Sequence, residues 1–124
     1  MKKGKYPAVI YCSVFGKYPP TPKKEIILRN QELICRNYAK NNNYLVTKVI
    51  EDYRYSPDSV GEDFMKFIFS CKKKEMGRYL IISKWQVIGN DFLEFYQNFS
   101  DYKNIWIVSA TQKKLNDQLD AHIW

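Results

Sequence analysis

Apolar residues in this chain form two alternating kinds of pattern. Four continuous, β-branched runs are typical of strands buried on both faces of a parallel sheet, and they lie at residues 8–14, 45–50, 79–83 and 105–109. Four other stretches repeat apolar residues at helical spacing, and they lie at 22–41, 62–75, 92–99 and 115–123. This alternation predicts βαβ units in an α/β, three-layer sandwich with a mainly parallel sheet of four to five strands.

The first helix has clear start and stop signals. Thr21 and Pro22 suit the N-cap and the first helical position, and the asparagines at 41–43 end the helix because Asn tolerates a left-handed backbone. The apolar side chains near one face of this helix are Ile27, Ile34, Cys35 and Tyr38. The polar, turn-rich stretch 51–61 that follows the second strand is predicted to be a loop.

Length and composition describe one globular domain over residues 1–124. An apolar content of 45% excludes a disordered chain, and no apolar run approaches the roughly 20 residues of a membrane helix. Three separated cysteines and a single histidine, His122, favour neither a disulfide framework nor a zinc site. We therefore expect a cytoplasmic protein with reduced thiols, no metal and no cofactor.

The formal net charge of +7 raises the expectation of a polyanionic partner. Lysines cluster in several places, and Lys72, Lys73, Lys74 and Lys84 are the candidates for contact with nucleic acid. The alternative is that the lysines sit at helix ends and loops and keep the protein soluble. Only 4 of the 20 basic residues are arginine, so sequence-specific reading of DNA bases is not expected.

Ligands of open α/β sheets bind at the carboxyl ends of the strands, and here those positions contain little catalytic chemistry. No glycine-rich phosphate loop of standard spacing follows a strand, which disfavours nucleotide binding. Aromatic residues occur there instead, and two interpretations stay open: a protein interface, or side chains that fill a vacated pocket. These residues are Tyr18, Tyr53, Tyr55 and Trp85.

The order of several segments resembles the catalytic domain of resolvase/invertase-type serine recombinases. Ala8-Val9-Ile10-Tyr11-Cys12-Ser13-Val14-Phe15 is similar to the opening strand of that family, and Tyr38-Ala39-Lys40-Asn41-Asn42-Asn43-Tyr44 to its Tyr-Ala-x-x-Asn-Gly-Tyr helix end. The later segments that follow the same order are 51–61, 79–84 and 106–111. The resemblance covers residues 8–112 and implies a resolvase-like fold.

The resemblance fails at the positions that carry the chemistry of the family. In that family a serine attacks a DNA phosphodiester and arginines hold the phosphate. The serine position falls on Phe15, and the strand arginine falls on Ser13. The arginine before the second helix falls on about Gly61, and the Asp and two Arg after the third strand fall on Gln86, Val87 and Asn90. No replacement has like chemistry, so no catalytic residue is assigned.

Three side chains near these positions could stand in for the lost chemistry. Ser13 shares a strand face with residue 15, but no arginine is aligned near Ser13. Arg54 and Lys84 are cations close by, and both are interpreted as solvated charges. A slipped alignment that hides an active site stays open.

The sequence thus predicts a catalytically inactive relative of the recombinase domain. Its expected role is a binding or regulatory module linked to DNA recombination or mobile elements, without a C-terminal DNA-binding domain. The partner is non-specific DNA, an active recombinase or another protein, and not a membrane. The alternative is an α/β enzyme of another class, a hydrolase or nucleotide-binding protein with an unrecognised site.

Overall fold

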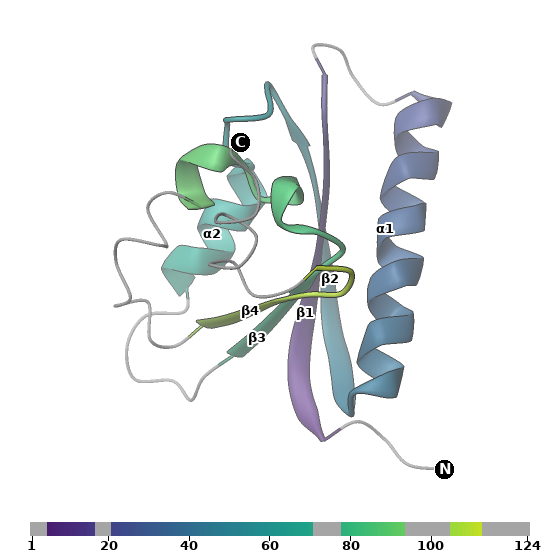
Figure 1. The fold of residues 1–124 in the computed structure, drawn as a ribbon. Coiled ribbons are helices and arrows are strands. Elements are labelled where there is room, and N and C mark those ends of the chain that lie inside the picture. Colours follow the sequence, from purple (N-terminus) through teal and green to yellow (C-terminus); the bar gives the residue numbers. More distant parts are fainter. Residues whose placement is uncertain (1–4, 17–20, 71–77, 94–104, 113–124) are drawn as a thin grey trace.

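The computed structural model describes residues 5–16, 21–70, 78–93 and 105–112. In these ranges four parallel strands form one sheet in the order β2-β1-β3-β4. The strands are β1 (Tyr6–Phe15), β2 (Tyr44–Arg54), β3 (Arg78–Ile82) and β4 (Ile105–Ser109). The helices are α1 (Pro22–Asn41), α2 (Glu62–Ser70) and the 3₁₀ turn η1 (Trp85–Val87). α1 covers one face of the sheet and α2 the other (Figure 1), which confirms the predicted three-layer α/β fold.

The central strand β1 is buried on both faces, as its continuous apolar run predicts. Val9 and Tyr11 belong to the core beneath α2, whereas Ile10 and Cys12 belong to the core beneath α1. Successive side chains of a strand point to opposite faces, so one strand supplies both cores and fixes the position of each helix.

The bounds of α1 agree with the sequence prediction. The Thr21 hydroxyl accepts a hydrogen bond from the Lys24 N–H at 3.2 Å, and just beyond the helix Asn43 has a φ of 67°. The buried face agrees with the prediction at Cys35, and Tyr38 packs against the same core. It differs at the isoleucines: Leu28 and Ala39 pack on the sheet, whereas Ile27 and Ile34 are 38% and 40% exposed.

β2 is longer than its apolar run predicts and takes in part of the predicted loop. β3 ends at Ile82, opposite Tyr11, so the last residues of β1 pair only with β2, up to Phe15 with Arg54. This pairing holds residues 51–54 in the sheet. Their side chains alternate: Glu51 and Tyr53 are exposed, whereas Asp52 and Arg54 are buried.

The remaining predicted elements are only partly covered by the described residues. α2 begins at Glu62 as predicted and buries Phe64, Phe67 and Ile68, and its predicted extension to 75 lies outside the description. Residues 90–93 are helical, and the rest of the predicted helix 92–99 and all of 115–123 also lie outside it. Across the described ranges, no helix combines the length and apolarity that spanning a membrane requires.

Cys12 and Cys35 are fully buried, free thiols. Burial, together with the charge of Glu32, raises the pKa of Cys35 to about 12, and burial also raises the pKa of Cys12. At pH 8 a thiol with pKa 12 is thiolate in about one molecule in ten thousand, against about a quarter for an ordinary thiol.

We therefore expect the two buried thiols to resist alkylation in the native protein. With Cys71→Ser as background, iodoacetamide at pH 8 should modify neither within an hour, whereas in 8 M urea both should react fully. Mass spectrometry of the intact protein counts the adducts. Rapid native alkylation of Cys35 would contradict the packing of α1 on the sheet.

Candidate functional site

The candidate site lies at the carboxyl end of β1, where the order in which the chain adds strands to the sheet reverses. The chain passes from β1 to β2 on one side and then returns to β3 on the other side of β1. Such a switch point is where open α/β sheets bind ligands. Because β1 extends beyond β3, Ser13 lies between Asp52 of β2 and the η1 turn.

Ser13 is held on every side and is only 3% exposed. Its hydroxyl donates to the Val87 carbonyl and accepts from Arg54 Nε at 2.9 Å. Its backbone is clamped by the Gln31 amide, which accepts from the Ser13 N–H at 2.8 Å and donates to the Ser13 carbonyl at 2.7 Å. The hydroxyl therefore has its donor and an acceptor position already in use.

Arg54 is buried, with 4% exposure, so its interpretation as a solvated charge is wrong. Besides Ser13, the partners of its guanidinium in the described part of the chain are backbone carbonyls: Nη1 donates to Ser56, Pro57 and Ser59 at 3.0, 3.2 and 3.0 Å, and Nη2 to Gln86 at 3.1 Å. Arg54 does lie beside Ser13, although no family arginine is aligned there.

Among the residues that the structure describes, no carboxylate is hydrogen-bonded to Arg54. Desolvation lowers the pKa of Arg54, while the nearby Tyr11 and Asp52 oppose that shift. The ring of Phe15 lies over the guanidinium, with its centre 5.6 Å from Cζ. Arg54 thus ties β2, the 56–59 turn and η1 together under an aromatic side chain.

Asp52 forms a second buried node beside Arg54. Its carboxylate accepts from the Tyr11 hydroxyl at 2.8 Å and from the backbone N–H groups of Asp63 and Phe64 at 3.1 and 2.9 Å, which caps α2. Burial, followed by the Asp52 charge, raises the pKa of Tyr11. The node occupies the space beside Gly61, where any Cβ would collide with the Asp52 carboxylate and the Tyr11 hydroxyl.

The three positions aligned with the family's Asp and two Arg, which are Gln86, Val87 and Asn90, lie within or against the protein's own packing. Val87 is buried, and Gln86 Oε1 is a buried oxygen without a hydrogen-bond partner. The Asn90 side chain donates to Asp58 at 2.8 Å and so ties the 56–59 turn to the helical residues 90–93. The structure therefore places Ser13, Phe15, Gln86 and Val87 around Arg54, and Gly61 lies beside the neighbouring Asp52–Tyr11 pair. The sequence offered Arg54 as a stand-in cation but not as the buried centre of the site.

The candidate contacts for nucleic acid are only partly described. Lys84 is exposed at the N-cap of η1, whereas Lys72, Lys73 and Lys74 lie outside the described residues. Of the aromatic residues, Trp85 is 3% exposed and fills the α2-side core, while Tyr53 and Tyr55 are 41% and 87% exposed. Tyr18 lies outside the described residues. The filled-pocket interpretation therefore fits Trp85, which is buried, and not Tyr53 or Tyr55, which are exposed.

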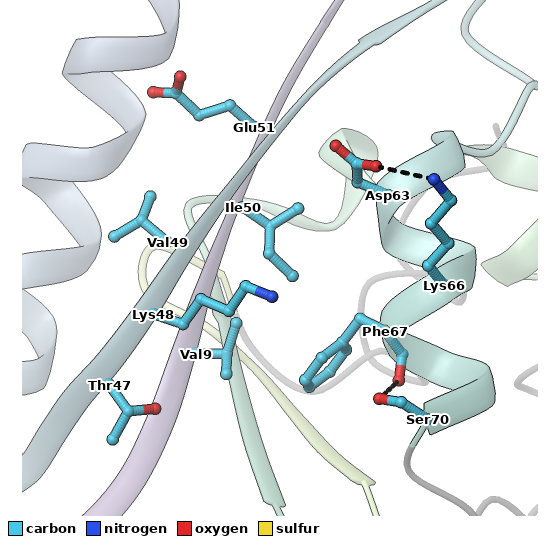
Figure 2. Close-up of a pocket in the computed structure, with 10 residues that line it drawn as sticks. All are labelled: Val9, Thr47, Lys48, Val49, Ile50, Glu51, Asp63, Lys66, Phe67 and Ser70. Carbon is cyan, nitrogen blue, oxygen red and sulfur yellow. Dashed lines mark hydrogen bonds and ion pairs between the residues drawn. The ribbon is translucent and has the colours of Figure 1, made fainter.

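A groove of about 550 Å³ opens between β2 and α2, away from Ser13. Figure 2 shows Val9, Lys48 and Ile50 on its sheet side, opposite the helix. On the helix side, Lys66 forms an ion pair with Asp63 at 3.9 Å. Among the residues that the structure describes, no group of three or more His, Cys, Asp or Glu side chains is placed to hold a metal ion.

The sheet order and the site at its switch point define an open, parallel α/β domain. The chain is similar to the C-terminal catalytic domain of ISC1926 TnpA, an IS607-like serine recombinase, with 19% identity, a TM-score of 0.64, and 93% of this chain and 76% of that chain covered. It is also similar to the N-terminal catalytic domain of TP901-1 integrase, with 16% identity, a TM-score of 0.61, and 90% and 78% covered.

These similarities confirm the resemblance at the level of the fold. No family model matches the sequence, and no curated protein matches it at a significant level. The chain has the fold of a serine recombinase catalytic domain.

Proposed function

We propose that this protein is a serine-recombinase-like domain that does not perform phosphoryl transfer and acts as a binding or regulatory module in DNA recombination. The observation that carries the proposal is the hydrogen-bonding of Arg54. Transfer through a covalent phosphoserine requires a free nucleophile and cations aimed at the developing charge. Here the guanidinium of the buried Arg54 donates hydrogen bonds to the Ser13 hydroxyl and to four backbone carbonyls.

The other aligned positions support the same proposal. Phe15 has no nucleophilic atom, and a phosphate-binding side chain does not fit at residue 61 while Tyr11 and Asp52 remain paired. Ser13 is buried, with its hydroxyl bonded to Val87 and Arg54. A phosphodiester would have to displace Arg54 from its carbonyls before it could reach this serine.

The proposed partner is a DNA duplex held without sequence preference through its phosphates, with an active recombinase or another protein as the alternative. A net charge of +7 supports phosphate contact. Lys84, exposed next to the switch point, would contribute with Lys72, Lys73 and Lys74.

Two measurements test inactivity and DNA binding separately. On supercoiled plasmid we expect no covalent protein–DNA adduct, whereas an active serine recombinase assayed in parallel should give one. In fluorescence anisotropy with a random duplex, binding should weaken steeply with salt. Changing Lys72, Lys73, Lys74 and Lys84 to Ala should reduce the slope of log K against log salt by about 3 to 4.

The matched control removes four exposed lysines elsewhere: Lys23, Lys40, Lys48 and Lys66. An equal loss of slope in this control would reduce the effect to net charge and contradict the proposed contact surface. An adduct that disappears in Ser13→Ala would overturn the proposed inactivity, even if DNA binding is as expected.

A further inference from the structure

α1 carries a row of exposed aliphatic residues that the domain core does not use. The core is served by Leu28, Cys35 and Ala39. The exposed residues are Ile26, Ile27, Leu33 and Ile34, with 53%, 38%, 55% and 40% exposure. Figure 1 shows α1 as an outer layer, with no described element beyond it. Four large aliphatic side chains on one solvent-facing side of a helix mark an interaction surface.

The spacing of this surface is that of a helix-pairing seam. Ile26, Asn30, Leu33 and Asn37 are separated by four, three and four residues, which is the a/d spacing of a coiled coil. The seam lies on the side of α1 opposite Cys35 and the sheet. Ile27 and Ile34 border it on one flank, at the e positions of the heptad.

We propose that α1 pairs in parallel with α1 of a second copy of this chain, about a twofold axis along the helices. The order of residues in the seam selects both the occupant and the direction. In a parallel pair each residue meets its own copy, so Asn30 meets Asn30, Asn37 meets Asn37 and Leu33 meets Leu33. An antiparallel pair would place asparagine against leucine and leave the amide groups without partners.

The charges next to the seam permit this arrangement. Arg29 and Arg36 occupy the g positions, where a parallel partner presents Ile34 and Asn41 rather than another cation. Arg36 is already paired with Glu32 at 2.7 Å. Glu25 and Glu32 lie on the flank toward β2, where they line a cleft together with Glu51. No like-charged pair therefore faces itself across the central part of the seam.

The area available sets the strength of the pairing. The four aliphatic side chains expose on the order of 300 Å² per copy, less than the roughly 800 Å² per partner of a standard interface. We expect a weak dimer with a Kd on the order of 100 μM. This inference does not depend on the proposed loss of catalysis or on DNA binding.

Sedimentation velocity on the whole protein, from 5 μM to 1 mM, tests the pairing. The wild type should shift from monomer to dimer over this range. Leu33→Glu should abolish the shift, and Asn30→Leu should lower the Kd about tenfold because it replaces a polar seam position by an apolar one. The matched control is Phe69→Glu on α2, which changes a residue of similar exposure, 57%, on the other face.

Disulfide trapping tests the direction of the helices. In a Cys71→Ser background, Asn37→Cys should form a covalent dimer on mild oxidation, because a parallel pair brings the two copies of residue 37 together. A monomer at 1 mM for both wild type and Asn30→Leu would overturn the proposal. So would a dimer that survives Leu33→Glu, one that is lost in Phe69→Glu, or the absence of the Asn37→Cys crosslink.

Discussion

Arg54→Ala is expected to lower the free energy of unfolding by about 3 to 5 kcal/mol. The substitution removes the donors for the carbonyls of Ser56, Pro57, Ser59 and Gln86 and for the Ser13 hydroxyl, at a site that is 4% exposed. Urea unfolding followed by circular dichroism measures the loss.

Two variants give this result its meaning. Arg36→Ala removes an exposed arginine whose partner among the described residues is Glu32, and it should cost no more than about 0.5 kcal/mol. Arg54→Lys keeps the charge but has three donors instead of five, so it should recover only part of the lost stability. Equal effects for the Ala variants at positions 54 and 36 would contradict a structural role for the buried guanidinium.

Gly61→Ala is expected to cost about 2 to 3 kcal/mol, the upper part of the range of about 1 to 3 kcal/mol that is typical of overpacking a core. The new methyl group would collide with the Asp52 carboxylate and the Tyr11 hydroxyl, and both are fixed by their mutual bond and by the cap on α2. Gly61→Arg, which restores the residue type that the resemblance implies, should destabilise more and yield no recombinase activity. Thermal unfolding and the adduct assay measure the two effects.

Gly16→Ala is the matched control, since its Cβ would approach only the end of the Lys24 side chain, with Nζ at 2.6 Å. A flexible lysine can move aside, so the change in stability should stay within about 0.5 kcal/mol. A Gly61→Ala protein as stable as Gly16→Ala would show that the Asp52–Tyr11 node yields to a side chain.

Most of the fold could be predicted from the sequence because both of its periodic signals are strong. The run at 105–109 coincides with β4, and the Thr21–Pro22 start and the asparagine stop bracket α1 at its observed bounds. The buried face of α1 was predicted only in part, at Cys35 and Tyr38. The exposed Ile27 and Ile34 are more hydrophobic than the buried Ala39, so hydrophobicity alone shifts the predicted face toward solvent.

The sequence located the candidate site at the strand ends but missed the buried roles of Asp52 and Arg54. Asp52 and Arg54 lie in the last four residues of β2, which carry charged or polar side chains on both faces of the strand. A polar stretch of this kind next to turn residues predicts a loop. Only the unequal lengths of β1 and β3 show that this segment must stay in the sheet as the partner of residues 13–15. That inequality is a tertiary property, so no local pattern contains it.

The Asp52–Tyr11 node also constrains the order in which substitutions can accumulate at this site. An arginine at 61 is incompatible with the pair, and the pair is incompatible with any side chain at 61. Replacing Asp52 removes the cap of α2, and replacing Tyr11 removes a hydrogen bond that holds the Asp52 carboxylate, so either change alone lowers stability. Substitutions at this site are therefore expected to be epistatic: a side chain at 61 and the loss of the Asp52–Tyr11 bond should change stability by different amounts together than the sum of their separate effects.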